Sequence, residues 1–187
     1  MTEILLALFL AYRSSAPSTE SPAEREVRLR LLSDTIVETC ERTPISSWPL
    51  YACTALVATV TKWESGLRRD IHDGKPGPSG EICIGQLHRS VSMIPNPDYA
   101  ITSQEREATK GIANTDKCID LTLRIIRYHV YRCERYRVDG TWDVSQIFAE
   151  YHHPTIRCTS AILPMSVKRA KDYKRIRNRL KEVVTHD

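Results

Sequence analysis

The stretch LYACTALVATVTKWESGL, residues 50–67, decides the fold of this chain. Its apolar residues recur with the i, i+3, i+4, i+7 spacing of one helix face, which predicts a helix from Leu50 to Trp63. The apolar face consists of Leu50, Ala52, Cys53, Leu56, Val57, Val60 and Trp63. The opposing face consists of Thr54, Thr59, Thr61 and Lys62. We therefore expect a core helix whose threonines face away from the core.

Glu64 follows directly, in the last turn of this helix and beside its buried face. A helix C-terminus carries partial negative charge, and apolar neighbours such as Trp63 exclude water. Both effects disfavour the ionised carboxylate and raise its pKa, as a general acid near neutral pH requires. The alternative is that Gly66 is an ordinary helix C-cap and Glu64 a solvated surface residue.

Several short motifs follow in a fixed order. After Glu64-Ser65 come a turn-rich loop (residues 70–80), Gln86 within CIGQL (residues 83–87) and Tyr151 within FAEYH (residues 148–152). In this joint order, over roughly residues 24 to 180, the chain resembles the lytic transglycosylase family. The resemblance implies a mainly α, lysozyme-like fold related to goose-type lysozymes.

The resemblance also implies a reaction, cleavage of the β-1,4 bond between N-acetylmuramic acid and N-acetylglucosamine in peptidoglycan. Glu64 is the expected general acid, which then acts as base to close a 1,6-anhydro ring. Ser65 is expected to orient the substrate or Glu64, Gln86 to line the sugar site, and Tyr151 to hold the Glu64 carboxyl. An inverting lysozyme would need a second carboxylate instead. The candidates for that role are Asp70, Asp73 and Glu81.

The chain departs from the family at two places. Ile84-Gly85-Gln86 stands where the family commonly has Leu-Met-Gln, and Tyr151-His152-His153-Pro154 stands where it has Tyr-Asn-x-Gly. The departures at Gly85 and His152 favour an alternative function. In that alternative the chain is a catalytically degenerate, structural or glycan-binding component of a virion or secretion apparatus.

Six cysteines in 187 residues, without Cys-x-x-Cys pairs, favour an oxidised, extracytoplasmic protein, whether periplasmic, secreted or virion-associated. A subgroup of the resembled family has four cysteines in the order of Cys83, Cys118, Cys133 and Cys158. We expect disulfides joining Cys40 to Cys53, Cys83 to Cys118, and Cys133 to Cys158, one of fifteen pairings that six cysteines allow. Six free buried thiols are the alternative.

The length and 41% hydrophobic content suit one globular domain, residues 23–187, after an apolar segment and Ser/Pro linker in residues 1–22. The apolar run Ile4 to Tyr12 is too short to span a bilayer. We expect a retained N-terminal helix, with a cleaved secretory segment as the alternative. Capping-box patterns predict further helices after Ser21 and Thr102, and apolar residues predict others after Thr115 and over 144–151. A last helix, rich in lysine and arginine, is expected from Ser166.

No cofactor and no metal site is expected. The histidines His72, His88, His152 and His153 lack helical ligand spacing, and His129 lies on an apolar stripe, as a hydrogen-bonded core histidine would.

The net charge of +4 favours anionic partners. The basic run from Lys168 to Lys181 predicts either a solvated helix face or a surface for anionic glycan, membrane or nucleic acid. Peptidoglycan strands are the expected partner, with phage tail or secretion-apparatus proteins as further candidates and no specific nucleic acid.

Overall fold

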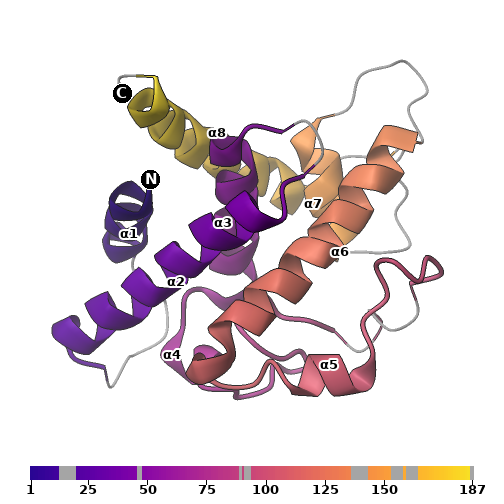
Figure 1. The fold of residues 1–187 in the computed structure, drawn as a ribbon, viewed down its shortest axis with the longest axis horizontal. Helices are drawn as coiled ribbons and strands as arrows, with labels where there is room; N and C mark the ends of the chain where they lie inside the picture. Colours follow the sequence, from indigo (N-terminus) through magenta and orange to yellow (C-terminus); the bar gives the residue numbers. More distant parts are fainter. Residues whose placement is uncertain are drawn as a thin grey trace.

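A computed structural model describes residues 1–12, 20–45, 48–88, 90, 94–135, 143–152, 158 and 164–185. This part of the chain is mainly helical, and its only β-pairing is an isolated bridge between Ile82 and Leu87 (Figure 1). The helices are α1 (Thr2–Ala11), α2 (Pro22–Arg42), α3 (Leu50–Ser65), α4 (Arg69–His72), α5 (Ser103–Glu107), α6 (Thr115–Arg135), α7 (Val144–His152) and α8 (Pro164–Val184), with a 3-10 turn at Ile112–Asn114. The linker residues 13–19 and the departures at His153 and Pro154 lie outside the described residues.

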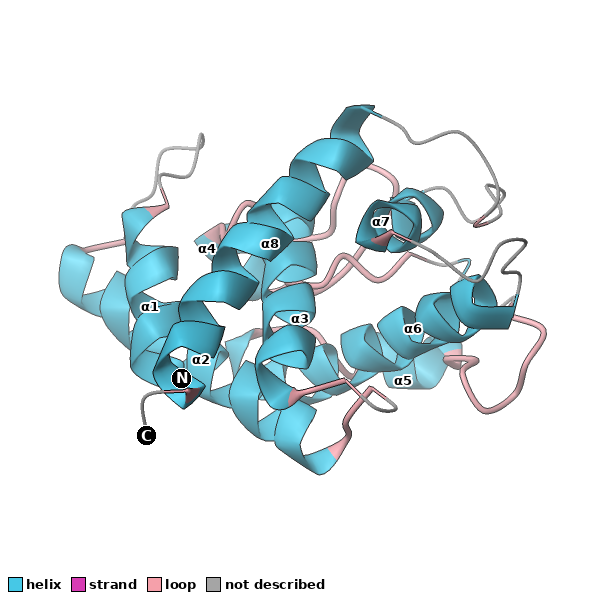
Figure 2. Cartoon of the chain, turned by 90° about the horizontal axis from the view of Figure 1, so that it is seen from above, coloured by secondary structure: helices cyan, strands magenta, loops and turns pink. Residues whose placement is uncertain are grey.

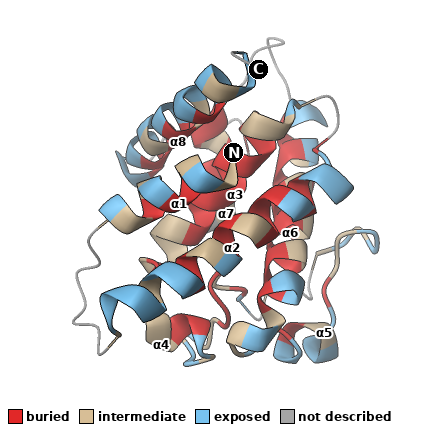
Figure 3. Ribbon diagram, turned by 60° about the vertical axis from the view of Figure 1, so that its left-hand side comes forward, coloured by how far each residue is buried: buried red, intermediate tan, exposed pale blue. Residues whose placement is uncertain are grey.

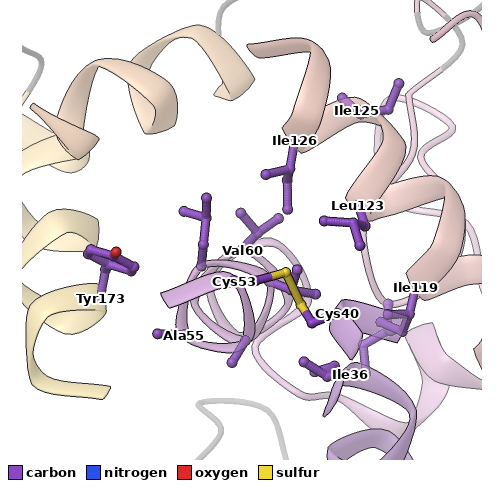
Figure 4. Packing of buried hydrophobic residues seen from close by; sticks show 14 of the residues in the cluster. Ile36, Cys40, Cys53, Ala55, Val60, Ile119, Leu123, Ile125, Ile126 and Tyr173 are labelled. Atoms are coloured by element: carbon purple, nitrogen blue, oxygen red, sulfur yellow. A yellow bond between two sulfur atoms is a disulfide. The ribbon is translucent and has the colours of Figure 1, made fainter. Parts of the chain in front are cut away.

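Helix α3 lies at the centre of the molecule. It packs against α8 on one side and against α2 and α6 on the other, so that Tyr173 of α8 and Ile126 of α6 lie on opposite sides of it (Figures 2 and 4). The predicted polar face of this helix is wrong, because Thr54, Thr59 and Thr61 are all fully buried. Thr59 and Thr61 donate their hydroxyls to carbonyls one turn back in the same helix, which removes the cost of burying them.

The two capping boxes are confirmed and fix where α2 and α5 begin. Ser21 Oγ accepts from the amide of Glu24 at 3.2 Å, while a Glu24 carboxylate oxygen accepts from the Ser21 amide at 2.8 Å. Thr102 and Glu105 repeat this arrangement at the start of α5. Each box satisfies backbone donors that a helix N-terminus otherwise leaves without partners.

Helix α1 is packed into the core by Leu5, Leu6 and Phe9 and lies against α2 and α8 (Figure 3). The Arg25 guanidinium of α2 donates to carbonyls at the end of α1, including that of Tyr12 at 2.6 Å. Whether this helix is retained stays a prediction. Within the described residues, every helix is too short or too polar to cross a bilayer.

The three expected disulfides are confirmed. Cys40–Cys53 joins α2 to α3 (Figure 4), Cys83–Cys118 joins the loop before Leu87 to α6, and Cys133–Cys158 joins the end of α6 to the segment after α7. These bonds use all six cysteines of the chain. Because such bonds persist in oxidising compartments, they indicate an extracytoplasmic environment.

Candidate active site

Glu64 is held at the C-terminal end of α3 by a tight helix stop. Gly66 adopts the left-handed conformation, with φ of 60°, and its amide bonds to the carbonyl of Lys62. Ser65 is buried, donates its hydroxyl to the carbonyl of Thr61 at 2.7 Å and accepts from the amide of Leu67 at 3.1 Å. Of the two roles expected for Ser65, this geometry fits the positioning of Glu64, because the hydroxyl is already used within the turn.

Arg169 of α8 forms an ion pair with Glu64, with 2.6 Å between the guanidinium nitrogen and the carboxylate oxygen. Both side chains are largely removed from water, since the side chain of Glu64 is 14% exposed and that of Arg169 is 4% exposed. The Arg169 guanidinium also lies 5.9 Å from the centre of the Trp63 ring. The carboxylate therefore has an aromatic neighbour and a buried cation close by.

The pKa of Glu64 is raised above its ordinary value of 4.5. Burial of the carboxylate is the largest cause, the charge and hydrogen bond of Arg169 oppose it, and the negative charge of Glu81 adds to the rise. The direction agrees with the expectation from sequence. A carboxyl that stays protonated at a higher pH than usual is suited to general acid catalysis. The nearby Arg169 cation stabilises the ionised form of Glu64 once the proton has left.

The sequence did not identify Arg169 as a site residue, because it lies within a run of lysines and arginines expected to be one solvated or anion-binding face. That expectation is wrong for Arg169, which is buried. The signal was the apolar spacing of α8, which places Arg169 on its core stripe. The stripe consists of Ser166, Arg169, Ala170, Tyr173, Ile176 and Leu180.

Asp172, one turn further along α8, fixes this helix against the end of α3. Its carboxylate accepts from Lys62 Nζ at 2.6 Å and from Trp63 Nε1 at 2.9 Å. Lys62 and Trp63 are the two residues before Glu64. Helix α8 therefore binds the Glu64 carboxylate through Arg169 and the turn that carries Glu64 through Asp172. The position of Glu64 therefore depends on α8.

The loop after α4 brings Glu81 and Gln86 together over Gly77. A β-carbon at Gly77 would lie 2.5 Å from a Glu81 carboxylate oxygen and 2.7 Å from the Gln86 side-chain oxygen. Both side chains therefore lie directly against this glycine. Gln86 has a positive φ of 53° and donates its side-chain amide to the carbonyl of Cys83. Gln86 is half-buried, and its role in binding sugar stays a prediction.

Tyr151 of α7 reaches the same loop but does not bind Glu64 as expected. Its hydroxyl donates to the carbonyl oxygen of Gly85 at 3.0 Å, and Arg169 is the residue that holds the carboxylate. Burial raises the pKa of Tyr151, and the charge of Glu64 raises it further, which places the two groups within electrostatic range. Tyr151 therefore fixes the loop that carries Gln86.

The two other candidate carboxylates are engaged elsewhere. Asp70 pairs with Arg68 at 2.5 Å and with Lys75 at 3.2 Å, and these partners lower its pKa to about 2. Asp73 pairs with Arg69 at 3.2 Å. Among the three carboxylates proposed for activating water, Glu81 is the one whose charge acts on Glu64.

Gly85 has a packing reason in this structure. A β-carbon there would overlap the hydroxyl of Thr122 on α6, because the loop backbone lies directly against that helix. The Thr122 hydroxyl is itself fixed by donating to the carbonyl of Cys118 at 2.7 Å. The glycine thus lets the loop approach α6 beside the Cys83–Cys118 disulfide.

We expect Gly85→Ala to lower the free energy of unfolding by about 2 kcal/mol, the usual cost of forcing an extra carbon into a packed site. Chemical denaturation followed by circular dichroism measures the loss. The double variant Gly85→Ala/Thr122→Ala removes the overlapping hydroxyl and should recover a large part of it. Equal losses in the single and double variants would contradict the steric explanation.

No protein-family model, curated protein or solved structure matches this chain.

Proposed function

We propose that this chain is a peptidoglycan-cleaving muramidase of the lytic transglycosylase type. The observation that carries the proposal is the state of Glu64, a mostly buried carboxyl with a raised pKa at a rigid helix end. Two further observations support it: Tyr151 lies within electrostatic range of Glu64, and its hydroxyl donates to the carbonyl of Gly85, the residue before Gln86. A general acid with flanking polar groups is what cleavage of a glycosidic bond requires.

In the proposed first step, protonated Glu64 gives its proton to the oxygen that bridges the two sugars. The bond between that oxygen and the anomeric carbon of N-acetylmuramic acid breaks, and the oxygen leaves as a hydroxyl. The carboxylate formed at Glu64 is stabilised by Arg169, 2.6 Å away. A buried cation at this distance favours the anion strongly, because little water screens the pair.

In the second step, the Glu64 carboxylate takes the proton of the 6-hydroxyl of the same N-acetylmuramic acid. That oxygen bonds to the anomeric carbon and closes a 1,6-anhydro ring, which returns Glu64 to its protonated form. No water is consumed, and one carboxyl serves both steps. A hydrolytic reaction would instead use Glu81 as the base that activates water, so the two reactions differ in their product.

Mass spectrometry of the released muropeptides tests the proposal. We expect products with 1,6-anhydro ends, which are lighter by one water than hydrolysed ends. Hydrolysed products that disappear in Glu81→Gln would instead identify an inverting lysozyme. Absence of any product from purified cell wall would contradict both reactions.

One observation favours the second candidate, a glycan-binding component without turnover. The ion pair with Arg169 favours the ionised form of Glu64, whereas the first step needs the protonated form. A purified protein that sediments with peptidoglycan, releases no muropeptides at any pH and binds equally well as Glu64→Gln would support this candidate.

A further inference from the structure

A second buried cluster surrounds Glu150 of α7. Glu150 is completely buried, and one of its carboxylate oxygens, Oε1, lies 2.8 Å from the guanidinium of Arg132. The other oxygen, Oε2, lies 3.0 Å from the sulfur of Cys158 and 3.6 Å from that of Cys133. It also lies 3.6 Å from Nδ1 of His129, which is itself buried.

This cluster leaves polar atoms without hydrogen-bond partners while the disulfide is formed. The sulfurs of Cys133 and Cys158 carry no hydrogen, so they donate nothing to Oε2. His129 Nδ1 has no hydrogen-bond partner within the described chain, which corrects the expectation of a hydrogen-bonded core histidine for this atom. Buried polar atoms of this kind are costly and uncommon, and a role in redox chemistry or the binding of an ion is one explanation for them.

We infer that the reduced protein binds a zinc ion through Cys133, Cys158 and Glu150, whose ligand atoms lie within 4.8 Å of one another, and that the His129 ring, outside this group but 3.6 Å from Oε2, turns to supply the fourth ligand. Two thiolates, one carboxylate and one imidazole are a ligand set that zinc accepts in tetrahedral geometry. Bond lengths of about 2.0 to 2.3 Å place the ligand atoms of such a site about 3.3 to 3.8 Å apart. The separations of Oε2 from Cys133 and from His129, both 3.6 Å, already fall in this range, and that from Cys158 is slightly shorter.

The charges of the cluster also suit a zinc ion. Zinc with two thiolates and one carboxylate carries a net charge of −1, and the Arg132 guanidinium at 2.8 Å from Glu150 compensates it. Arg132 thus holds Oε1 of Glu150, the oxygen that does not face the metal, as residues that support the ligands of known metal sites do. Buried charge is tolerated when it is paired in this way.

The site forms only after a thiol–disulfide exchange. A dithiol reductant gives two electrons and two protons to the Cys133–Cys158 bond, becomes a disulfide itself and leaves two thiols on the protein. Zinc binding then releases both thiol protons, because thiolates are the ligands. The freed sulfurs need to separate to about 3.8 Å to bind one ion. In an oxidising compartment the disulfide excludes the metal.

The site would connect α6, α7 and the segment of Cys158 before the disulfide forms. His129 and Cys133 lie on α6, and Glu150 lies on α7 next to Tyr151. The rings of His129 and Tyr151 are in edge contact, with 5.6 Å between their centres. A metal here would therefore hold the helix that presents Tyr151. The inference does not depend on the proposed function.

The test uses cobalt(II) as a spectroscopic probe for zinc. The whole protein is reduced with a dithiol under argon, separated from the reductant and titrated with cobalt chloride. We expect one ion per chain, with sulfur-to-cobalt charge-transfer absorption and the intense visible bands of tetrahedral cobalt, both removed by added zinc. The oxidised protein should give neither signal.

The variant Cys133→Ser/Cys158→Ser should lose the signals, whereas the matched variant Cys40→Ser/Cys53→Ser, which removes a different disulfide, should keep them. Glu150→Gln and His129→Phe should weaken zinc binding at least about tenfold, as loss of supporting groups does in known sites. If the reduced chain is unfolded, circular dichroism replaces the cobalt signal as the test. Helix content should then recover when zinc is added to the unmodified chain, and should not recover in Cys133→Ser/Cys158→Ser. Signals unchanged in that variant, or no binding at all, would overturn the inference.

Discussion

Replacing Glu64 by Gln is expected to lower the rate of peptidoglycan cleavage about a thousandfold, within the range that a general acid contributes. Glutamine keeps the size and the polar oxygen of the side chain but has no acidic proton to give. The rate of dye release from labelled cell wall measures the loss. Product mass before and after the substitution shows whether residual cleavage follows the same reaction.

The control for this substitution is Glu41→Gln, which changes an exposed glutamate of α2 far from the site in sequence and should leave the rate unchanged. Circular dichroism is needed in parallel, since a neutral amide in place of the Glu64 carboxylate no longer compensates the charge of Arg169. A folded Glu64→Gln protein that clears cell wall as fast as the unmodified protein would remove Glu64 from the mechanism.

Replacing Arg169 by Met is expected to have the second large effect, on both stability and pH dependence. Breaking a buried ion pair leaves a carboxylate without compensation, and we expect a loss of about 3 kcal/mol in the free energy of unfolding at pH 7. The loss should shrink below pH 4.5, because Glu64 is then protonated in the folded and unfolded states alike. Denaturation at several pH values measures this difference.

The sign follows from the pKa of Glu64, which is raised in the folded protein. A raised pKa means that the fold prefers the neutral carboxyl, so ionisation destabilises the fold as pH rises above 4.5 and through the folded pKa. Without Arg169 the pKa rises further. Since a general acid works only when protonated, the alkaline limb of the rate profile should move to higher pH.

Arg175→Met provides the matched control, because Arg175 is an exposed arginine on the same helix. It should leave both the stability and the pH profile unchanged. Arg169→Lys should restore part of the original profile, since it returns the positive charge without the planar guanidinium. A profile for Arg169→Met with the original pH dependence and only a lower amplitude would show that Arg169 serves stability alone.

Much of the fold follows from local sequence rules. The capping boxes at Ser21 and Thr102 marked helix starts to the residue, and Gly66 marked the end of α3. These signals are reliable because each satisfies backbone groups within a few residues of itself. The expected disulfide pairing is confirmed for all three bonds.

What the sequence did not provide was how distant elements cover one another. The threonines of α3 were expected to form a polar face, yet they are buried, and the hydroxyls of Thr59 and Thr61 donate to their own backbone. Arg169 was one charge in a basic run, and only the packing of α8 on α3 shows that it meets Glu64. Tyr151 was expected to hold the Glu64 carboxyl, but its hydroxyl donates to the carbonyl of Gly85. Local periodicity contains no information about such pairings.

The dependence of Glu64 on α8 also has a consequence for biosynthesis. The ribosome makes Glu64 105 residues before Arg169, which neutralises the carboxylate, and earlier still than Asp172, which anchors its turn. A nascent chain that ends before residue 164 therefore contains Glu64 but lacks both Arg169 and the hydrogen bond of Asp172 to Trp63. The arrangement around Glu64 is therefore completed only when the first turns of α8 pack against the end of α3.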